Sequence, residues 1–301
     1  MFAEAHADGF DATWRKKSAS HLRKLRGSPN IMLHEEADDL PLMKSPGPVL
    51  MILAAYLLFV LKVGPTFMRK REAYKLKMTL LLYNAVQVVL SVYLMMKYGY
   101  FMYRMGLIPK ACYIEREDMR GEILLGIWWY FAAKITELLD TVFFVFRKKY
   151  NQISFLHLYH HTVMAIGTWA MLKYFPSHLL FFIGFLNSFI HVLMYTYYGL
   201  SSFGERFANY LTWKKYMTTL QMIQFVMIVF QYMLSVRASE CPPSRGITIF
   251  VASNTTFILL LFLNFYKQSY TRKGAGKSIS NGSLANGLNC VQSVLDERKV
   301  K

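Results

Sequence analysis

Seven apolar blocks, each about as long as a bilayer is thick, restrict what this 301-residue chain can fold into. A helix of about 20 apolar residues crosses the hydrocarbon core of a membrane. The approximate limits of the blocks are 49–68, 76–101, 121–146, 153–175, 178–202, 213–236 and 246–268. The positive mean hydropathy of +0.24 and the 54% of hydrophobic residues agree with this interpretation. We expect an all-α membrane protein with seven transmembrane helices.

The segments outside the blocks are polar. Residues 1–47 form an irregular N-terminal tail with basic and acidic runs, and residues 271–301 form a C-terminal tail. We expect both tails to be flexible and residues 48–270 to form one helical domain. The N-terminal tail has no apolar run followed by small residues, so we expect no cleaved signal peptide.

The net charge of +17 orients the helices. Basic residues gather in 69–77, 147–149, 206–215 and 267–277, which all lie on one side of a seven-helix bundle. The loops on the other side are balanced or poor in charge. The positive-inside rule therefore predicts a lumenal N-terminus and a cytosolic C-terminus. Because the basic residues flank apolar blocks, we expect membrane lipid and no nucleic acid as a partner.

Three histidines open the fourth block. His157, His160 and His161 stand at positions i, i+3 and i+4, so their rings project from one helix face. Ionisable groups inside membrane segments usually face a bundle interior or a wet cavity, and they indicate function. The alternative is a structural hydrogen-bonded cluster between packed helices.

Other polar residues fall at the same predicted depth, in the cytosolic half of the bundle. They come from the third, fifth and sixth blocks, and they are Lys134, Glu137, Asp140, Asn187, His191, Tyr195, Tyr198, Gln221 and Gln224. Four helices thus predict a polar cavity that opens to the cytosol. The charged residues could instead form a structural ion-pair ladder. The tyrosines could form an interfacial aromatic belt, and the glutamines could hold helices together.

Among the side chains of the predicted cavity, histidine is the favoured reactive group. The pattern His-x-x-His-His also occurs in membrane di-iron desaturases and hydroxylases, so a metal-dependent lipid oxidase or desaturase is the alternative. Such sites need several histidine boxes, and this bundle has one. Cys112 and Cys241 lie in loops away from the cavity, Cys290 lies in the tail, and no Gly-x-Ser-x-Gly motif exists. For covalent chemistry, histidine is then the best candidate.

Four motifs in order carry a resemblance to a known family. They are Lys134-Ile-Thr-Glu-Leu-Leu-Asp-Thr141, His157-Leu-Tyr-His-His161, His191-Val-Leu-Met-Tyr-Thr-Tyr-Tyr198 and Thr218-Thr-Leu-Gln-Met-Ile-Gln224. In this order and spacing they resemble the elongation of very long chain fatty acids family, the membrane 3-ketoacyl-CoA synthases. The resemblance covers roughly residues 45–270.

The resemblance implies a multi-pass enzyme of the endoplasmic reticulum that condenses a long acyl-CoA with malonyl-CoA. The products would be 3-ketoacyl-CoA, carbon dioxide and CoA, without a metal or other cofactor, and the other elongation-cycle enzymes would be partners. Basic residues at the cavity mouth could hold the CoA phosphates; these are Lys148, Lys149, Lys214 and Lys215. An apolar tunnel behind the histidines would hold the acyl chain, with Leu172 and Leu180 near its closed end.

The expected roles follow from the chemistry of condensation. We expect the His160 imidazole to take the acyl group and His191 to be the second imidazole, with His157 and His161 positioning their neighbour. The charged residues expected to set ring tautomers or complete an ion pair are Lys134, Glu137 and Asp140. Since the lumen is oxidising, we expect a Cys112–Cys241 disulfide. The non-enzyme alternative is a seven-helix receptor or transporter.

Overall fold

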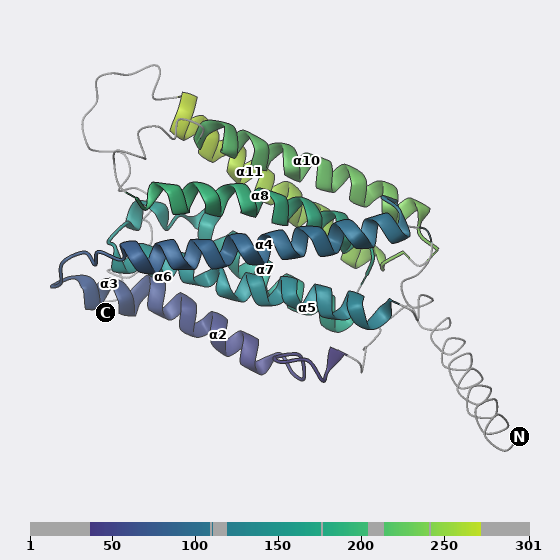
Figure 1. The fold of residues 1–301 in the computed structure, drawn as a ribbon, viewed down its shortest axis with the longest axis horizontal. Helices are drawn as coiled ribbons and strands as arrows, with labels where there is room; N and C mark the ends of the chain where they lie inside the picture. The colour runs from purple at the N-terminus through teal and green to yellow at the C-terminus, as the bar shows by residue number, and fades with distance from the viewer. Residues whose placement is uncertain are drawn as a thin grey trace, which may run out of the picture.

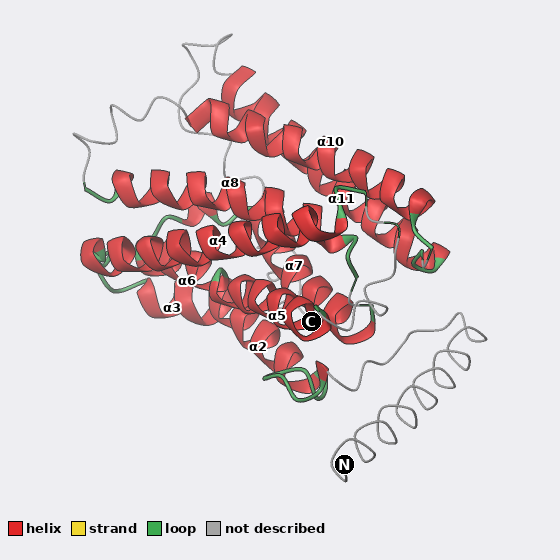
Figure 2. Cartoon of the chain, turned by 45° about the vertical axis from the view of Figure 1, so that its right-hand side comes forward, coloured by secondary structure: helices red, strands yellow, loops and turns green. Residues whose placement is uncertain are grey.

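The computed structural model describes residues 37–108, 110, 119–175, 177–203, 214–240 and 242–271, and within these ranges the chain forms helices and no strand (Figure 2). The elements are α2 (Gly47–Leu58), η2 (Phe59–Val63), α3 (Gly64–Met68), α4 (Lys77–Met105), α5 (Arg120–Thr136), α6 (Leu138–Phe146), η4 (Tyr150–Gln152), α7 (Phe155–Tyr174), α8 (Leu180–Ser201), α10 (Lys214–Ala238), α11 (Arg245–Tyr266) and η5 (Lys267–Thr271). The long helices lie side by side in one bundle (Figure 1). The all-helical prediction is confirmed.

Five helical stretches of the described chain are long and apolar enough to cross a membrane. They are Gly47–Met68, Lys77–Met105, Leu180–Ser201, Lys215–Ala238 and Arg245–Tyr270. The predicted span 121–146 is interrupted, because α5 has 17 residues, α6 has 9, and Glu137 separates them. The predicted span 153–175 corresponds to α7, which contains the three histidines. The count of seven spans and their orientation therefore stay predictions.

The closest packing in the bundle joins α4 to α8. At Gly184 of α8, an added Cβ would lie 2.5 Å from Cε2 of Tyr98, whose ring is fully buried. A glycine at this position lets the two helices approach closely, as small residues do in membrane bundles. In the rest of the bundle α5 packs on α7, and α10 packs on α8 and α11.

The hydrophobic core lies between α2, α4, α5, α6, α7 and α8. Its large side chains include Tyr98, Phe101, Phe131 and Phe181, which pack ring against ring or against neighbouring aliphatic groups. By contrast, Ile258 is the one buried side chain among the residues of α11. The bundle thus has a dense interior and a thinly packed edge at α11.

Residues 37–46, which belong to the predicted N-terminal tail, pack against the bundle. Ala37 and Met43 are fully buried. The indole nitrogen Nε1 of Trp128 donates to the carbonyl of Pro41 at 3.0 Å, and that of Trp169 donates to the carbonyl of Leu42 at 2.9 Å. Lys173 of α7 forms an ion pair with Asp38. The flexibility predicted for residues 1–36 and 272–301 concerns segments outside the described residues.

Candidate active site

The break between α5 and α6 carries a buried acid and its partner cation. The Thr136 hydroxyl donates to the carbonyl of Ala133 at 2.8 Å, a contact that competes with the helix ladder and bends helices. Glu137 is the single residue between the two helices. The amide of Asp140 donates to the carbonyl of Glu137 at 3.2 Å, and this i to i+3 contact makes a tighter turn than an α-helix does. This break turns the Glu137 side chain into the bundle interior, where it is 4% exposed.

Lys134 and Glu137 form a buried ion pair across this break. Nζ of Lys134 donates to Oε1 of Glu137 at 2.8 Å and to Oε2 at 3.1 Å. It also donates to Oδ1 of Asn187 on α8 at 2.7 Å, and the same oxygen accepts from the Tyr130 hydroxyl at 2.8 Å. Buried charges need such partners, because an uncompensated charge away from water is costly. The pair therefore ties α5 to α8 at this level of the bundle.

Glu137 also orients an imidazole. Its Oε1 lies 3.1 Å from Nδ1 of His191, and both side chains are buried. A carboxylate accepts from a protonated Nδ1, so the lone pair of the ring stays on Nε2. The same arrangement of carboxylate and imidazole prepares the base in hydrolytic triads. His191 can thus act at Nε2 as a base or a nucleophile.

The histidine box sits in the first turns of α7. Ser154 caps this helix, since its side chain accepts from the amide of His157 at 3.2 Å. The ring centroids of His157 and His161 are 4.3 Å apart, and those of His160 and His161 are 5.7 Å apart. Nδ1 of His160 is buried and has no hydrogen-bond partner among the described residues. Glu137 and His191 are among the ionisable neighbours of His160, so the box and the Glu137–His191 pair share one region.

The chain has clear relatives among known proteins. The model of the family described as ELO: GNS1/SUR4 matches residues 41–278, which is most of the chain. The chain belongs to the GNS1/SUR4 family. The very long chain fatty acid elongase 4 of Mus musculus is 37% identical over 87% of this chain and 85% of its own length. The very long chain fatty acid elongase 4 of Homo sapiens is 39% identical over 84% of this chain and 82% of its own length. The very long chain fatty acid elongase 7 of Drosophila melanogaster is 36% identical over 83% of this chain and 77% of its own length.

The second carboxylate of this GNS1/SUR4 chain has a different partner. Oδ2 of Asp140 accepts from the Tyr195 hydroxyl at 2.8 Å, and Tyr195 is fully buried. The Tyr195 ring centroid lies 5.6 Å from that of His191 and 6.2 Å from that of Tyr198, whose side chain is 38% exposed. Asp140 thus orients a tyrosine beside His191, and Tyr198 lies farther towards the surface.

The two predicted glutamines lie on α10, next to α8. Nε2 of Gln221 lies 3.8 Å from Sδ of Met194. Gln224 is 3% exposed, and its Oε1 has no hydrogen-bond partner among the described residues. Within the described ranges, no hydrogen bond joins either side chain to the Lys134–Glu137 pair. The structure therefore places both glutamines beside α8 but outside that network.

The predicted phosphate-binding lysines come from two segments at one end of the bundle, the end of α6 and the start of α10 (Figure 1). Lys148 is half-buried in a turn with φ of 53°, and Lys149 is exposed. Lys215 is exposed, with Nζ 5.9 Å from the centroid of the Tyr266 ring. The side chain of Lys214 lies outside the described residues.

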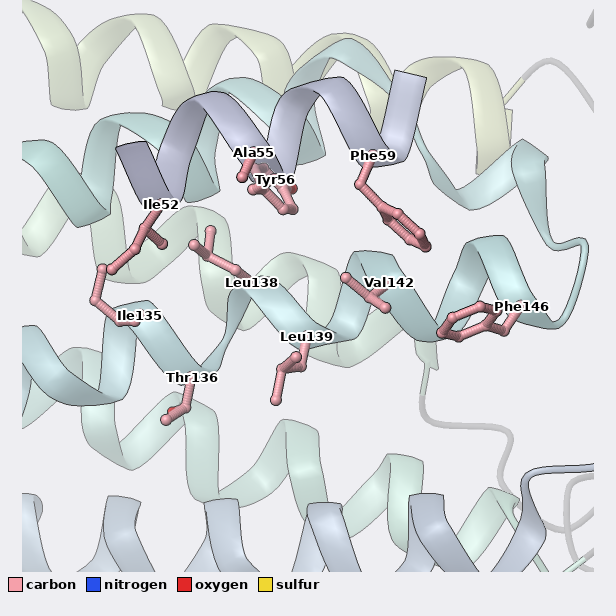
Figure 3. Close-up of a pocket in the computed structure, with 10 residues that line it drawn as sticks. All are labelled: Ile52, Ala55, Tyr56, Phe59, Ile135, Thr136, Leu138, Leu139, Val142 and Phe146. Carbon is pink, nitrogen blue, oxygen red and sulfur yellow. The ribbon is translucent and has the colours of Figure 1, made fainter. Parts of the chain in front are cut away.

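A cavity of about 520 Å³ lies between α2 and the α5–α6 segment (Figure 3). Apolar side chains make up nearly all of its lining, and none of the predicted site residues is among them. The predicted acyl tunnel behind the histidines therefore stays a prediction. Leu172, at its expected closed end, is fully buried in the core, and Leu180 packs against that core.

The predicted disulfide falls on residues outside the described ranges, as do all three cysteines. The neighbouring residues are nevertheless in contact, because the amide of Glu240 donates to the carbonyl of Lys110 at 2.9 Å. Lys110 stands two residues before Cys112 and Glu240 one residue before Cys241, so the disulfide stays a prediction that this contact favours. For a metal, the described part of the chain holds no group of three or more His, Cys, Asp or Glu side chains arranged as ligands.

Three partners of the site residues are not among the predicted site residues, although one of them, Thr141, closes the first of the four motifs. Tyr130 donates to Asn187, and Thr141 contacts both Tyr56 and His157. Tyr130 stands four residues before Lys134, so helical spacing could have placed it on the same face. Tyr56 lies in the apolar first block, where nothing separates it from residues that face lipid.

Proposed function

We propose that this chain is a very-long-chain 3-oxoacyl-CoA synthase, which condenses a long-chain acyl-CoA with malonyl-CoA in the first step of fatty acid elongation. The observation that carries the proposal is the Glu137–His191 contact of 3.1 Å beside the histidine box. It supplies an oriented imidazole in the same region as His160, whose Nδ1 is buried and has no hydrogen-bond partner in the described part of the chain. The names of the relatives, which are very long chain fatty acid elongases, support the substrate class.

In the first half-reaction, a ring nitrogen of neutral His160 attacks the thioester carbonyl of acyl-CoA. A carbon–nitrogen bond forms, the carbon–sulfur bond breaks, and the CoA thiolate takes up the proton that the imidazole loses. The resulting acyl-imidazole is an activated acyl donor, so one difficult step is divided into two easier ones. No thiol is needed for this step.

In the second half-reaction, malonyl-CoA loses carbon dioxide and leaves an enolate. The enolate carbon attacks the acyl carbonyl, the carbon–carbon bond of the 3-ketoacyl-CoA forms, and the carbon–nitrogen bond to His160 breaks. The departing imidazole takes up one proton from water, which returns His160 to its neutral state. Nε2 of His191, oriented by Glu137, promotes the decarboxylation or holds the acyl group. His157 and His161 keep the box in place, and Asp140 holds Tyr195 beside His191.

The proposal includes a location and a mode of substrate binding. Seven membrane crossings in the endoplasmic reticulum, with a lumenal N-terminus, would turn the lysines of 148–149 and 214–215 to the cytosol. There they would attract the phosphates of both CoA substrates. An apolar tunnel between the helices would hold the acyl chain. The other elongation-cycle enzymes would receive the product in the same membrane.

Single-turnover chemistry tests this proposal. Purified protein given acyl-CoA alone should release up to one CoA per enzyme and carry an acyl mass on a peptide that contains His160 or His191. His160→Gln should abolish both the burst and elongation. His178→Gln is the matched control and should retain both, because His178 precedes α8 and contacts Ser239 at 3.4 Å. If acyl-CoA alone releases no CoA while both substrates turn over normally, attack is direct and the covalent step is wrong.

We also propose that the reaction needs no metal. Elemental analysis of the purified, active protein tests this directly. Iron or zinc at one ion per chain, together with loss of elongation on chelation, would favour the histidine-box oxidase or desaturase alternative.

A further inference from the structure

A chain of hydrogen bonds leads from α2 to the histidine box. The Tyr56 hydroxyl lies 2.8 Å from Oγ1 of Thr141, and the same oxygen lies 2.8 Å from Nε2 of His157. The three residues come from α2, α6 and α7. The Tyr56 ring projects from α2 towards α6 at the wall of the 520 Å³ cavity (Figure 3). None of the four motifs lies on α2, yet this helix contacts the box through two hydroxyl groups.

The direction of these hydrogen bonds follows from counting donors. Thr141 is fully buried and Tyr56 is 6% exposed, so each hydroxyl proton needs a partner within the protein. If Nε2–H of His157 donated to Thr141, one of the two hydroxyl protons would have no acceptor among the described residues. Only one arrangement gives both hydroxyl protons an acceptor: Tyr56 donates to Thr141, and Thr141 donates to Nε2 of His157. The ring proton then lies on Nδ1 of His157, which is not one of the buried atoms without a partner in the described part of the chain. The other arrangements leave a buried donor unpaired, which is costly.

We propose that Tyr56 and Thr141 are positioning residues that hold His157 as the neutral tautomer with its proton on Nδ1. The Nε2 lone pair of His157 is then occupied by the Thr141 hydroxyl and does not attack a thioester. Phe144 covers the ring from α6, with centroids 5.4 Å apart, and further limits its rotation. His157 thus becomes a fixed neighbour of His161 and His160, and His160 keeps the free nitrogen.

The tautomer can be measured without any activity. The chain has eight histidines, so ¹⁵N-histidine-labelled protein in lipid vesicles gives few nitrogen signals, and subtraction of the His157→Gln spectrum isolates those of His157. We expect a protonated Nδ1 and an unprotonated, hydrogen-bonded Nε2 in the wild type and in Thr141→Ser. Thr141→Val, which has the shape of threonine but no hydroxyl, should lose that signature, and Tyr56→Phe should lose part of it. A protonated Nε2 in the wild type would overturn the proposal.

The effect on rate rests on the proposed function and is tested separately. Thr141→Val should lower kcat of elongation about tenfold, as loss of an outer hydrogen-bond partner of a functional histidine does elsewhere, with an unchanged KM for acyl-CoA. Thr141→Ser should restore kcat, and Tyr56→Phe should lower it less. Tyr93→Phe, on α4 and 39% exposed, is the control for loss of a tyrosine hydroxyl.

The outcomes separate the two proposals. Equal kcat in Thr141→Val and Thr141→Ser, or equal effects of Tyr56→Phe and Tyr93→Phe, would overturn the positioning role. If wild-type protein turns over neither CoA substrate, the proposed function fails, while the nitrogen spectrum still decides the tautomer.

Discussion

The two sides of the bundle interior treat their polar groups differently. On the paired side, which we define as Lys134, Glu137, Asn187 and His191, each residue contacts another at 3.1 Å or less. The α10 side is defined as Gln221 and Gln224. Here Nε2 of Gln221 lies 3.8 Å from the sulfur of Met194, and Oε1 of Gln224 has no hydrogen-bond partner among the described residues. Buried polar groups usually find partners within the protein. The groups of the paired side therefore hydrogen-bond to one another, whereas on the α10 side one amide oxygen has an unused hydrogen-bonding capacity within the described residues.

The largest effect should come from breaking the paired side. Glu137→Gln leaves Lys134 as a buried charge without its counter-ion, and removal of one partner of a buried pair costs about 3–5 kcal/mol. It also leaves His191 without a carboxylate. We expect a clear fall in the unfolding temperature in detergent and loss of CoA release. In the double variant Lys134→Met with Glu137→Gln, stability should recover but activity should not. Equal losses of stability in the single and double variants would contradict a coupled pair.

The second-largest effect should come from removing the predicted Cys112–Cys241 disulfide. The amide of Glu240 contacts the carbonyl of Lys110, and these two residues stand close in sequence to Cys241 and Cys112. We expect a disulfide whose loss in Cys112→Ser lowers stability by about 2–4 kcal/mol. Mass spectrometry of unreduced, alkylated peptides should find the cross-link, with Cys290 alkylated as the internal control. Alkylation of both Cys112 and Cys241 would show that the bond is absent.

A smaller effect is expected on the α10 side. Gln224→Met removes an oxygen without a partner among the described residues and keeps the length of the side chain, so the free energy of unfolding should not fall. If the oxygen or the amide binds substrate, KM for one CoA substrate should rise several-fold, which corresponds to a hydrogen bond of about 0.5–1.5 kcal/mol. Titrating each substrate at saturating levels of the other identifies which one. A loss of stability with unchanged KM would make Gln224 part of the scaffold and remove the contrast between the sides.

The smallest effect on turnover should come from changes at Leu172 and Leu180, the predicted closed end of the acyl tunnel. Leu172 is fully buried beside Trp169, and Leu180 packs against the same core. Bulkier residues at either position should shorten the products without abolishing elongation, because they would fill the closed end of the tunnel. Overpacking costs about 1–3 kcal/mol, so protein stability is followed in parallel. An unchanged product profile across a series of sizes would place the length ruler elsewhere.

Helical spacing predicts much of the paired side. The i, i+3 and i+4 positions of the histidines and the i, i+3 spacing of Lys134 and Glu137 predict shared faces, and the structure places these faces in one region. Asn187 and His191, one turn apart on α8, join them. These residues can be predicted from the sequence because polar side chains are rare within apolar blocks.

Other features depend on contacts between helices, which no local pattern contains. Tyr56 resembles a lipid-facing residue until α2 packs on α6 and brings its hydroxyl to Thr141. The break at Glu137 has no glycine or proline to announce it, so residues 121–146 resemble one continuous span. The packing of residues 37–46 depends on two indole nitrogens that reach backbone carbonyls far away in the chain. In each case the deciding partner is distant in sequence.

The local nature of the Lys134–Glu137 pair also affects how the protein is made. A charged side chain near the centre of a membrane helix costs about 2.5–3.5 kcal/mol to insert. Residues 121–146 are a predicted membrane span, and in such a span two charges three residues apart would enter the bilayer together, long before Asn187 and His191 are synthesised. In a cell-free translation assay with microsomes, we expect Glu137→Gln to lower the inserted fraction of the 120–146 segment and Asn187→Ala to leave it unchanged. The ion pair at the site would then also serve the membrane insertion of the segment that carries it.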